Sequence, residues 1–386
     1  MLIAATVSTL LLASASLVAQ DPQAAAPDGG GPTIAPVFRS GEAGYRTFRI
    51  PAIVRAADGA LVAFAEGRRN GASDSGDIDI VLKRSEDLGR SWSKLQVIAD
   101  HGAGVAGNPC PVVDNASGDI VLLFVRQPEG CHEGDIRADR KGYRDPFVMR
   151  SNDHGKSWSE AQALPGCDRK EWRWYATGPC HAIQLQHGPH KGRIVAPANH
   201  SVVGSGANDH LGAHLLISDD GGKTFVLGAV EDSHTGNDII NPSETTIAEL
   251  HNGDLYINTR DQHGKSPGTR AVTRSTDQGQ TLTGSLVDEE ALTGPVCQGS
   301  VLAIPVDDDR TTLLFSGPSA DNRRERLAVR SSTDGGKTWQ EQQVLYQGSA
   351  AYSDLVRLED DRIGCLFEID GYSAIVFTSF DAPAAR

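Results

Sequence analysis

The chain has no run of basic residues interleaved with aromatic side chains. Its 386 residues carry 36 Lys and Arg against 50 Asp and Glu, which gives a formal net charge of −14. Because nucleic-acid phosphates are bound by clustered positive charge, no nucleic-acid partner is expected. An anionic substrate would have to be held by individual arginines that act against the overall negative field.

Long apolar runs are also missing beyond residue 19, and no convincing amphipathic helix appears. The one apolar run, residues 2–19, is diluted by Ser and Thr and ends in Leu17-Val18-Ala19, which is typical of a cleaved signal peptide. We therefore expect a signal peptide over 1–19, a flexible Ala/Pro/Gly linker over 20–36 and one folded domain over 37–386. The mature protein is expected to be secreted or periplasmic, with no membrane insertion after signal cleavage.

Cysteine is scarce, with six residues and no C-x-x-C motif. The even count allows disulfides in an oxidising compartment, with fifteen possible pairings, whereas the apolar flanks of the last two cysteines favour buried free thiols. His187 with His190 and His210 with His214 have metal-like spacing. Their surroundings are rich in Gly and Pro and not helical, so no metal site is expected.

Glycine, in contrast, is abundant at 42 residues, which points to many tight turns. The pattern Ser-x-Asp-x-Gly-x-(Ser/Thr)-(aromatic or Leu) occurs five times, and we call each copy an Asp box. The boxes cover 85–92, 151–158, 218–225, 275–282 and 332–339. In such a turn the Asp accepts hydrogen bonds from the turn's own amides, Gly supplies a positive φ, and the last residue packs between strands.

The spacing of the boxes predicts the fold. Successive boxes begin 66, 67, 57 and 57 residues apart, and strand-like runs flank them. A period near sixty with four short strands per unit is typical of a β-propeller. About 350 residues divided by this period predict an all-β, six-bladed β-propeller. The sixth blade has no box, and an N-terminal strand is expected to complete it.

The segment Phe48-Arg49-Ile50-Pro51 opens the first repeat. Together with the Asp boxes it resembles the bacterial-type exo-α-sialidases (neuraminidases), a family that removes terminal sialic acid from glycans. The resemblance extends from about Val37 to Phe380. It implies a sialylated glycan as substrate and hydrolysis with retention through a covalent tyrosyl intermediate, without a metal or cofactor.

The resemblance also implies three arginines that clamp the substrate carboxylate. Arg49 matches the first and Arg260, in LYINTR, matches the second. The third is best matched by Arg324, although Arg323 and Arg326 leave its register open by a residue or two. Planar guanidinium forks suit a carboxylate because they pair with it bidentately.

The catalytic residues are implied in the same way. The family uses a Tyr nucleophile, since a carboxylate would be repelled by the substrate's own carboxylate, and Tyr352 in AYSDL matches it. Glu244, in NPSETTIAEL, matches the base that takes the phenol proton. Asp74 aligns with the acid/base, with Asp77 as the alternative, and Arg68 matches the residue that contacts the C4 hydroxyl.

Further matches surround this set. Glu368 matches the glutamate that orients the first arginine, and Asn108 and Tyr175 are placed on the N-acetyl and glycerol side of the pocket. Cys180 stands where many relatives have Gly, so the local backbone conformation is in question. Because Cys110 and Cys180 begin inner strands of neighbouring blades, a disulfide between them is a further hypothesis.

Two alternatives remain open at this point. A propeller without catalysis could bind sialoglycans as a lectin, although it would not need the set of Asp74, Glu244 and Tyr352. The same fold could also act as a trans-sialidase, or hydrolyse a related nonulosonic acid such as the deaminated sugar. Linkage preference, the sialic acid variant and the oligomeric state are not determined by the sequence.

Overall fold

A computed structural model of the chain describes residues 34–202, 210–231, 240–262, 268–307, 309–359 and 361–383. The predicted signal peptide and all but the last three residues of the predicted linker lie outside these ranges. The first strand, β1 (Ala35–Arg39), begins two residues before the predicted domain boundary. Within the described ranges, no helix has the length and apolar character needed to span a membrane.

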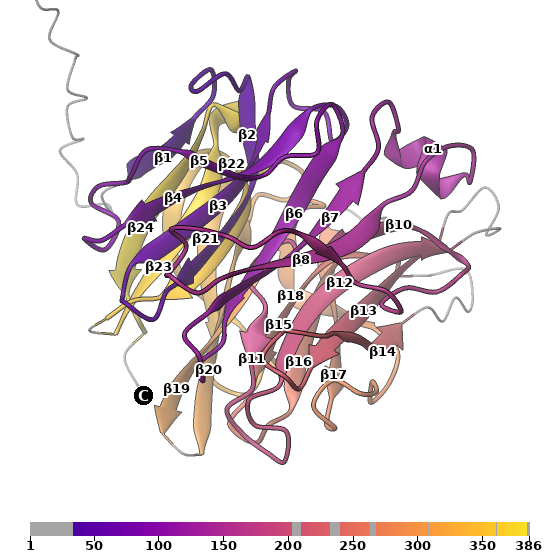
Figure 1. The fold of residues 1–386 in the computed structure, drawn as a ribbon. Helices are drawn as coiled ribbons and strands as arrows, with labels where there is room; N and C mark the ends of the chain where they lie inside the picture. Colours follow the sequence, from indigo (N-terminus) through magenta and orange to yellow (C-terminus); the bar gives the residue numbers. More distant parts are fainter. Residues whose placement is uncertain are drawn as a thin grey trace, which may run out of the picture. The chain divides into compact units, whose positions relative to one another are not determined.

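Hydrogen bonds join the described strands into four sheets of seven, five, four and eight strands. The two largest sheets each divide into two blades, at the short parallel contact of β4 (Ile78–Ser85) with β6 (Val105–Val113) and at the shared strand β22 (Gln340–Arg357), which gives the six blades of the propeller (Figure 1). Blade one contains β2 (Thr47–Arg55), β3 (Leu61–Arg68), β4 (Ile78–Ser85) and β5 (Gln96–Ala99). Blade two contains β6 (Val105–Val113), β7 (Ile120–Gln127), β8 (Asp145–Ser151) and β9 (Gln162–Ala163). Blade three contains β10 (Trp172–Thr177), β11 (Ile183–Gln184), β12 (Ile194–Val202), β13 (Leu211–Ser218) and β14 (Val226–Glu231). Blade four contains β15 (Pro242–Glu249), β16 (Leu255–Asp261), β17 (Gly268–Ser275) and β18 (Val287–Gly294). Blade five contains β19 (Ser300–Asp307), β20 (Arg310–Pro318), β21 (Glu325–Ser332) and the first half of β22 (Gln340–Arg357). Blade six contains the second half of β22, β23 (Arg362–Ile369), β24 (Ala374–Asp381) and β1.

The ring closes as the sequence predicts. β1 pairs antiparallel with β24, so the N-terminal strand becomes the outer strand of the last blade. Figure 1 shows this indigo strand beside the yellow C-terminal one. The long β22 pairs with β21 in its first half and with β23 in its second, which joins blades five and six. A short helix, α1 (Glu133–Arg137), lies between β7 and β8.

Each Asp box forms the turn between the last two strands of its blade. In the first box, Ser85 Oγ donates to Asp87 at 2.8 Å and accepts from the Gly89 N–H at 2.8 Å. The other four boxes repeat both bonds. A Cβ on Gly89 would collide with Phe377 of blade six, against which Trp92 also packs edge-on. The box therefore needs glycine for close packing on the neighbouring blade as well as for its positive φ of 88°.

A buried carboxylate connects four blades between their inner strands. Asp354, in the second half of β22, is fully buried and accepts a hydrogen bond from the Ile53 N–H of β2 at 2.9 Å. It also accepts from Ser300 Oγ of β19 at 2.8 Å, and from both the N–H and the Nδ1 of His181, which lies between β10 and β11. This carboxylate satisfies donors that the blade ladders leave unpaired.

All six cysteines are buried free thiols, so the hypothesis of a disulfide between Cys110 and Cys180 is wrong. Burial raises the pKa of both thiols well above the ordinary value, which keeps them protonated. Cys180 has φ 133°, a backbone conformation that favours glycine. Cys180 therefore holds a conformation suited to glycine although it carries a side chain.

Candidate active site

A cavity of about 250 Å³ opens where the inner strands converge. All six blades contribute to its wall, through Arg49 on β2, Asn108 on β6, Trp174 on β10, Glu244 on β15, Arg324 before β21 and Tyr352 on β22. A larger hollow of about 750 Å³ lies at the other end of β2 and β22, beside Arg55 and Arg357. Both of those arginines already pair with carboxylates, Glu359 and Asp361. The smaller cavity therefore carries the candidate chemistry.

The inner strands of five blades break register at the residue that faces the cavity. The irregularities fall at 49–52 in β2, 107–110 in β6, 172–175 in β10, 242–245 in β15 and 350–353 in β22. A β-bulge re-aims the side chains at that point, and Ile50 and Asn108 take positive φ values of 58° and 54° there. This repeated bulge turns inner-strand side chains into the cavity.

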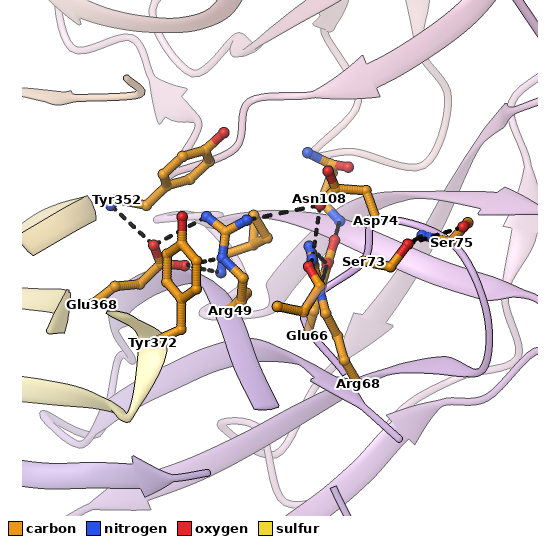
Figure 2. A network of polar contacts seen from close by, with 12 residues as sticks. Arg49, Glu66, Arg68, Ser73, Asp74, Ser75, Asn108, Tyr352, Glu368 and Tyr372 are labelled. Atoms are coloured by element: carbon orange, nitrogen blue, oxygen red, sulfur yellow. Dashed lines mark hydrogen bonds and ion pairs between the residues drawn. The ribbon is translucent and has the colours of Figure 1, made fainter. Parts of the chain in front are cut away.

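A bulge also frees backbone N–H groups, and buried glutamates accept from them. Glu368 accepts from the Ile50 N–H at 2.9 Å and from the Tyr352 N–H at 3.2 Å, while both of its oxygens hold Arg49 at 3.1 Å (Figure 2). Glu66 accepts from the Asn108 N–H at 2.8 Å in the same manner. The carboxylate that accepts from the N–H groups freed by a bulge thus also holds an arginine side chain in position. For Glu368 this is the role that the resemblance implies.

The three predicted clamp arginines converge around the Tyr352 side chain. The guanidinium carbon of Arg49 lies 4.8 Å from the ring centre and that of Arg324 lies 5.5 Å from it. Arg260 donates from Nη1 to the Tyr352 hydroxyl at 3.2 Å. Figure 2 shows Arg49 beside Tyr352 and Tyr372, and the Tyr372 ring centre lies 4.0 Å from that guanidinium.

The structure decides the register that the sequence left open for the third arginine. Arg324 lines the cavity and donates to the Val296 carbonyl at 3.1 Å and to the Tyr372 hydroxyl at 3.2 Å. Arg323 is 75% exposed and pairs with Glu325. Arg326 pairs with Glu341, outside the cavity.

Tyr352 and Glu244 form the pair expected of a phenol and its base. The Tyr352 hydroxyl donates to Glu244 Oε1, and Arg260 donates to Glu244 Oε2 at 2.7 Å. Burial raises the pKa of Tyr352 well above its usual value, and the charge of Glu244 adds to this. Burial also raises the pKa of Glu244, but Arg260 and the phenol outweigh it and hold that pKa below the ordinary value. The resting pair is therefore a neutral phenol beside an ionised carboxylate.

Asp74 lies on the β3–β4 loop at the cavity rim, with its side chain 62% exposed. Its carboxylate pairs with Arg68 at 2.7 Å and lies 3.8 Å from Arg49, whereas Asp77 pairs with Arg69 and does not line the cavity. Partial desolvation at the cavity rim raises the pKa of Asp74, but the charges of Arg68 and Arg49 outweigh this and bring the pKa below the ordinary value. In the free protein Asp74 is thus held as a carboxylate.

Tyr175 does not line the cavity, so its predicted place in the pocket is not what the structure shows. Its side chain is 2% exposed, packs with Trp172 and His214, and donates to the Cys167 carbonyl at 3.1 Å. Trp174 faces the cavity instead. The bulge in β10 and the alternation of a strand explain the shift by one residue.

Several further cavity residues escaped sequence reasoning, among them Arg144, Asn199 and Gln262. Arg144 lies after a long β7–β8 connection and Gln262 at the end of β16, and neither belongs to a recognisable motif. Asn199 sits in β12, beside the inner strand of its blade, where periodicity indicates a buried position but not which cavity it faces. No group of three or more His, Cys, Asp or Glu side chains within the described ranges is arranged to hold a metal ion.

Comparisons with known proteins show the family and the fold of the chain. The family described as BNR repeat-like domain matches residues 59–366. The chain is 30% identical over 380 residues to an exo-alpha-sialidase of Aspergillus fumigatus, which covers 88% of this chain and 84% of the relative. It is 30% identical over 393 residues to a sialidase of Micromonospora viridifaciens, which covers 95% of this chain and 57% of that one. The solved structure of a Hadza microbial sialidase has a TM-score of 0.78 at 24% identity, over 90% of this chain and 68% of that chain, and this confirms the propeller fold.

Proposed function

Because the chain belongs to the exo-α-sialidase family, a group of glycoside hydrolases, we propose that its cavity hydrolyses terminal sialic acids with retention through a Tyr352-linked intermediate. The observation that carries this proposal is the neutral Tyr352 phenol, hydrogen-bonded to ionised Glu244 and surrounded by three arginines. A lectin would have no need to pair a buried phenol with a base.

Binding would begin with the substrate carboxylate at Arg49, Arg260 and Arg324. These side chains are held by Glu368, by Glu244, and by the Val296 carbonyl, so their forks are oriented before the ligand arrives. A preorganised clamp avoids the entropic cost of ordering long side chains. It also places the anomeric carbon, which bears that carboxylate, next to the Tyr352 oxygen.

The chemistry then follows as two displacements. In the first, the Tyr352 oxygen bonds to the anomeric carbon, Glu244 takes the phenol proton, and Asp74 donates its proton to the leaving glycosidic oxygen. In the second, water attacks the same carbon, Asp74 takes a proton from it, and the phenol leaves with the proton that Glu244 held. Two inversions give net retention.

Purified protein should release the fluorophore from an aryl α-sialoside, and proton NMR of the early product should show the α-anomer. A 2,3-difluorosialic acid should leave its mass on the tryptic peptide that contains Tyr352. Turnover that gives the β-anomer first would contradict the covalent mechanism but not the hydrolase. Binding of the sialoside without turnover would favour a lectin.

The arginines beside Asp74 predict different pH dependences for kcat/KM and kcat. In the free protein, Arg68 and Arg49 hold the pKa of Asp74 low, so its protonated form is lost as pH rises through that low value. A bound substrate carboxylate offsets the charge of Arg49, which raises the pKa of Asp74 in the complex. The basic limb of kcat should therefore lie at higher pH than that of kcat/KM. Coincident limbs would show that Asp74 does not control the rate.

A further inference from the structure

Arg144 is a buried cation in the cavity wall that has no carboxylate on either of its anchored nitrogens. It is 4% exposed, and its Nη1 donates to Gln127 Oε1 at 2.6 Å while its Nη2 donates to Asn108 Oδ1. Within the described part of the chain, its Nε has no hydrogen-bond partner. Burial lowers the pKa of Arg144 to about 10. The Nε is buried, so an acceptor brought by a ligand would bind the remaining N–H groups of the two Nη atoms, and a desolvated guanidinium in the cavity wall gains stability from such an acceptor.

The contacts around Arg144 place it on one side of the sugar, if the proposed function holds. Arg68, the match for the residue at the C4 hydroxyl, is held by Glu66 Oε2 at 2.6 Å. Glu66 Oε1 in turn accepts from the Asn108 N–H, and Asn108 contacts Arg144. The resemblance also places Asn108 on the N-acetyl side of the pocket, and Arg144 contacts Asn108, so we take the C5 substituent to face both side chains.

The wall at this place does not suit an acetamido group. The methyl of an acetamide needs apolar surroundings, and the aromatic side chain nearby is Trp174. One face of its ring is already covered by the Arg144 guanidinium, whose carbon lies 4.1 Å from the ring centre. Because Gln127 and Asn108 hold both ends of the fork, Arg144 cannot swing aside without the loss of two buried hydrogen bonds.

From this geometry we infer that Arg144 determines specificity at C5, and that the preferred substrate is the deaminated nonulosonic acid, which carries a hydroxyl there. The hydroxyl oxygen accepts from the guanidinium, is smaller than an acetamide and leaves no methyl against a charge. A site built to hydrogen-bond a hydroxyl discriminates strongly against a ligand that leaves the donor unpaired.

The test compares kcat/KM for three aryl α-glycosides that differ only at C5: hydroxyl, N-acetyl and N-glycolyl. We expect the deaminated glycoside to be preferred over the N-acetyl one by about 10- to 100-fold, the range of one hydrogen bond to a charged donor. A preference for either amide sugar would overturn the inference. The ratio is measured within one preparation, so it does not depend on the fraction of folded protein.

Two variants distinguish a specific role of Arg144 from the general effect of removing a positive charge. Arg144→Leu should reduce the preference for the hydroxyl to within about threefold of unity or reverse it, whereas Arg150→Leu should leave the ratio unchanged. Arg150 is the matched control because it lies on the same blade, in β8, and pairs with Asp119 outside the cavity. An unchanged ratio in Arg144→Leu would also overturn the inference.

Binding separates this inference from the proposed function. Calorimetry with the 2,3-unsaturated analogue of each sugar needs no turnover. The deaminated analogue should bind at least about tenfold more tightly than the N-acetyl one, even in a protein that hydrolyses none of the glycosides. Equal binding of the analogues with active turnover would refute the role of Arg144 and leave the hydrolase intact.

Discussion

Tyr352→Phe is expected to lower kcat/KM on an aryl α-sialoside by at least about a thousandfold, which is the scale on which loss of a nucleophile acts. The variant lacks the oxygen that would bond to the anomeric carbon, while Glu368 still holds Arg49 and the Val296 carbonyl still holds Arg324. Affinity for the 2,3-unsaturated analogue should therefore change by less than about tenfold. A steady-state fluorescence assay and calorimetry check the two parts.

Tyr175→Phe is the matched control for this experiment. Tyr175 is also buried, and its hydroxyl makes one hydrogen bond, to the Cys167 carbonyl, outside the cavity. Loss of that bond should cost about 1 kcal/mol of stability and leave kcat/KM within about twofold. Activity that survives in Tyr352→Phe would show that the nucleophile lies elsewhere, and activity lost in Tyr175→Phe would place that residue back in the pocket.

Asp354→Asn should lower the free energy of unfolding by about 3–5 kcal/mol, which is the usual cost of breaking a buried charged pair. The carboxylate accepts from Ile53, from Ser300 and twice from His181. An amide NH₂ in its place would face donors from other blades. Urea unfolding followed by tryptophan fluorescence measures the change, and Asp381→Asn at the exposed end of β24 should shift stability by less than about 0.5 kcal/mol.

The same pair predicts how that loss depends on pH. Burial lowers the pKa of His181, but Asp354 outweighs burial and raises it above the ordinary value. A raised pKa in the folded state means that the contribution is complete below about pH 6.5 and is lost as pH rises through the folded-state pKa. The difference between the parent and Asp354→Asn should thus be larger at pH 6 than at pH 9. A difference that grows with pH would contradict the ion pair.

The Asp boxes made the fold predictable because each box is a local device. Ser85, Asp87 and Gly89 satisfy one another within one turn, so residue types at short spacing are enough to identify it. The period between boxes then indicates how many strands separate them. The motif residues Arg49 and Tyr352 could be matched for a similar reason, since each lies in a short recognisable segment.

Which side chains of a segment face the cavity could not be predicted in this way. The sequence by itself determined the six blades, the closing N-terminal strand and the motif residues that converge at the axis. Only the tertiary structure decided that Arg324 and not its neighbours enters the cavity, that Trp174 and not Tyr175 faces it, and that Arg144 covers Trp174. For Trp174 and Tyr175 the physical reason is the bulge in β10, which changes the face of the strand to which a side chain points. Arg324 and Arg144 lie in the connections before β21 and β8, and the course of these connections depends on contacts between segments that are distant in sequence.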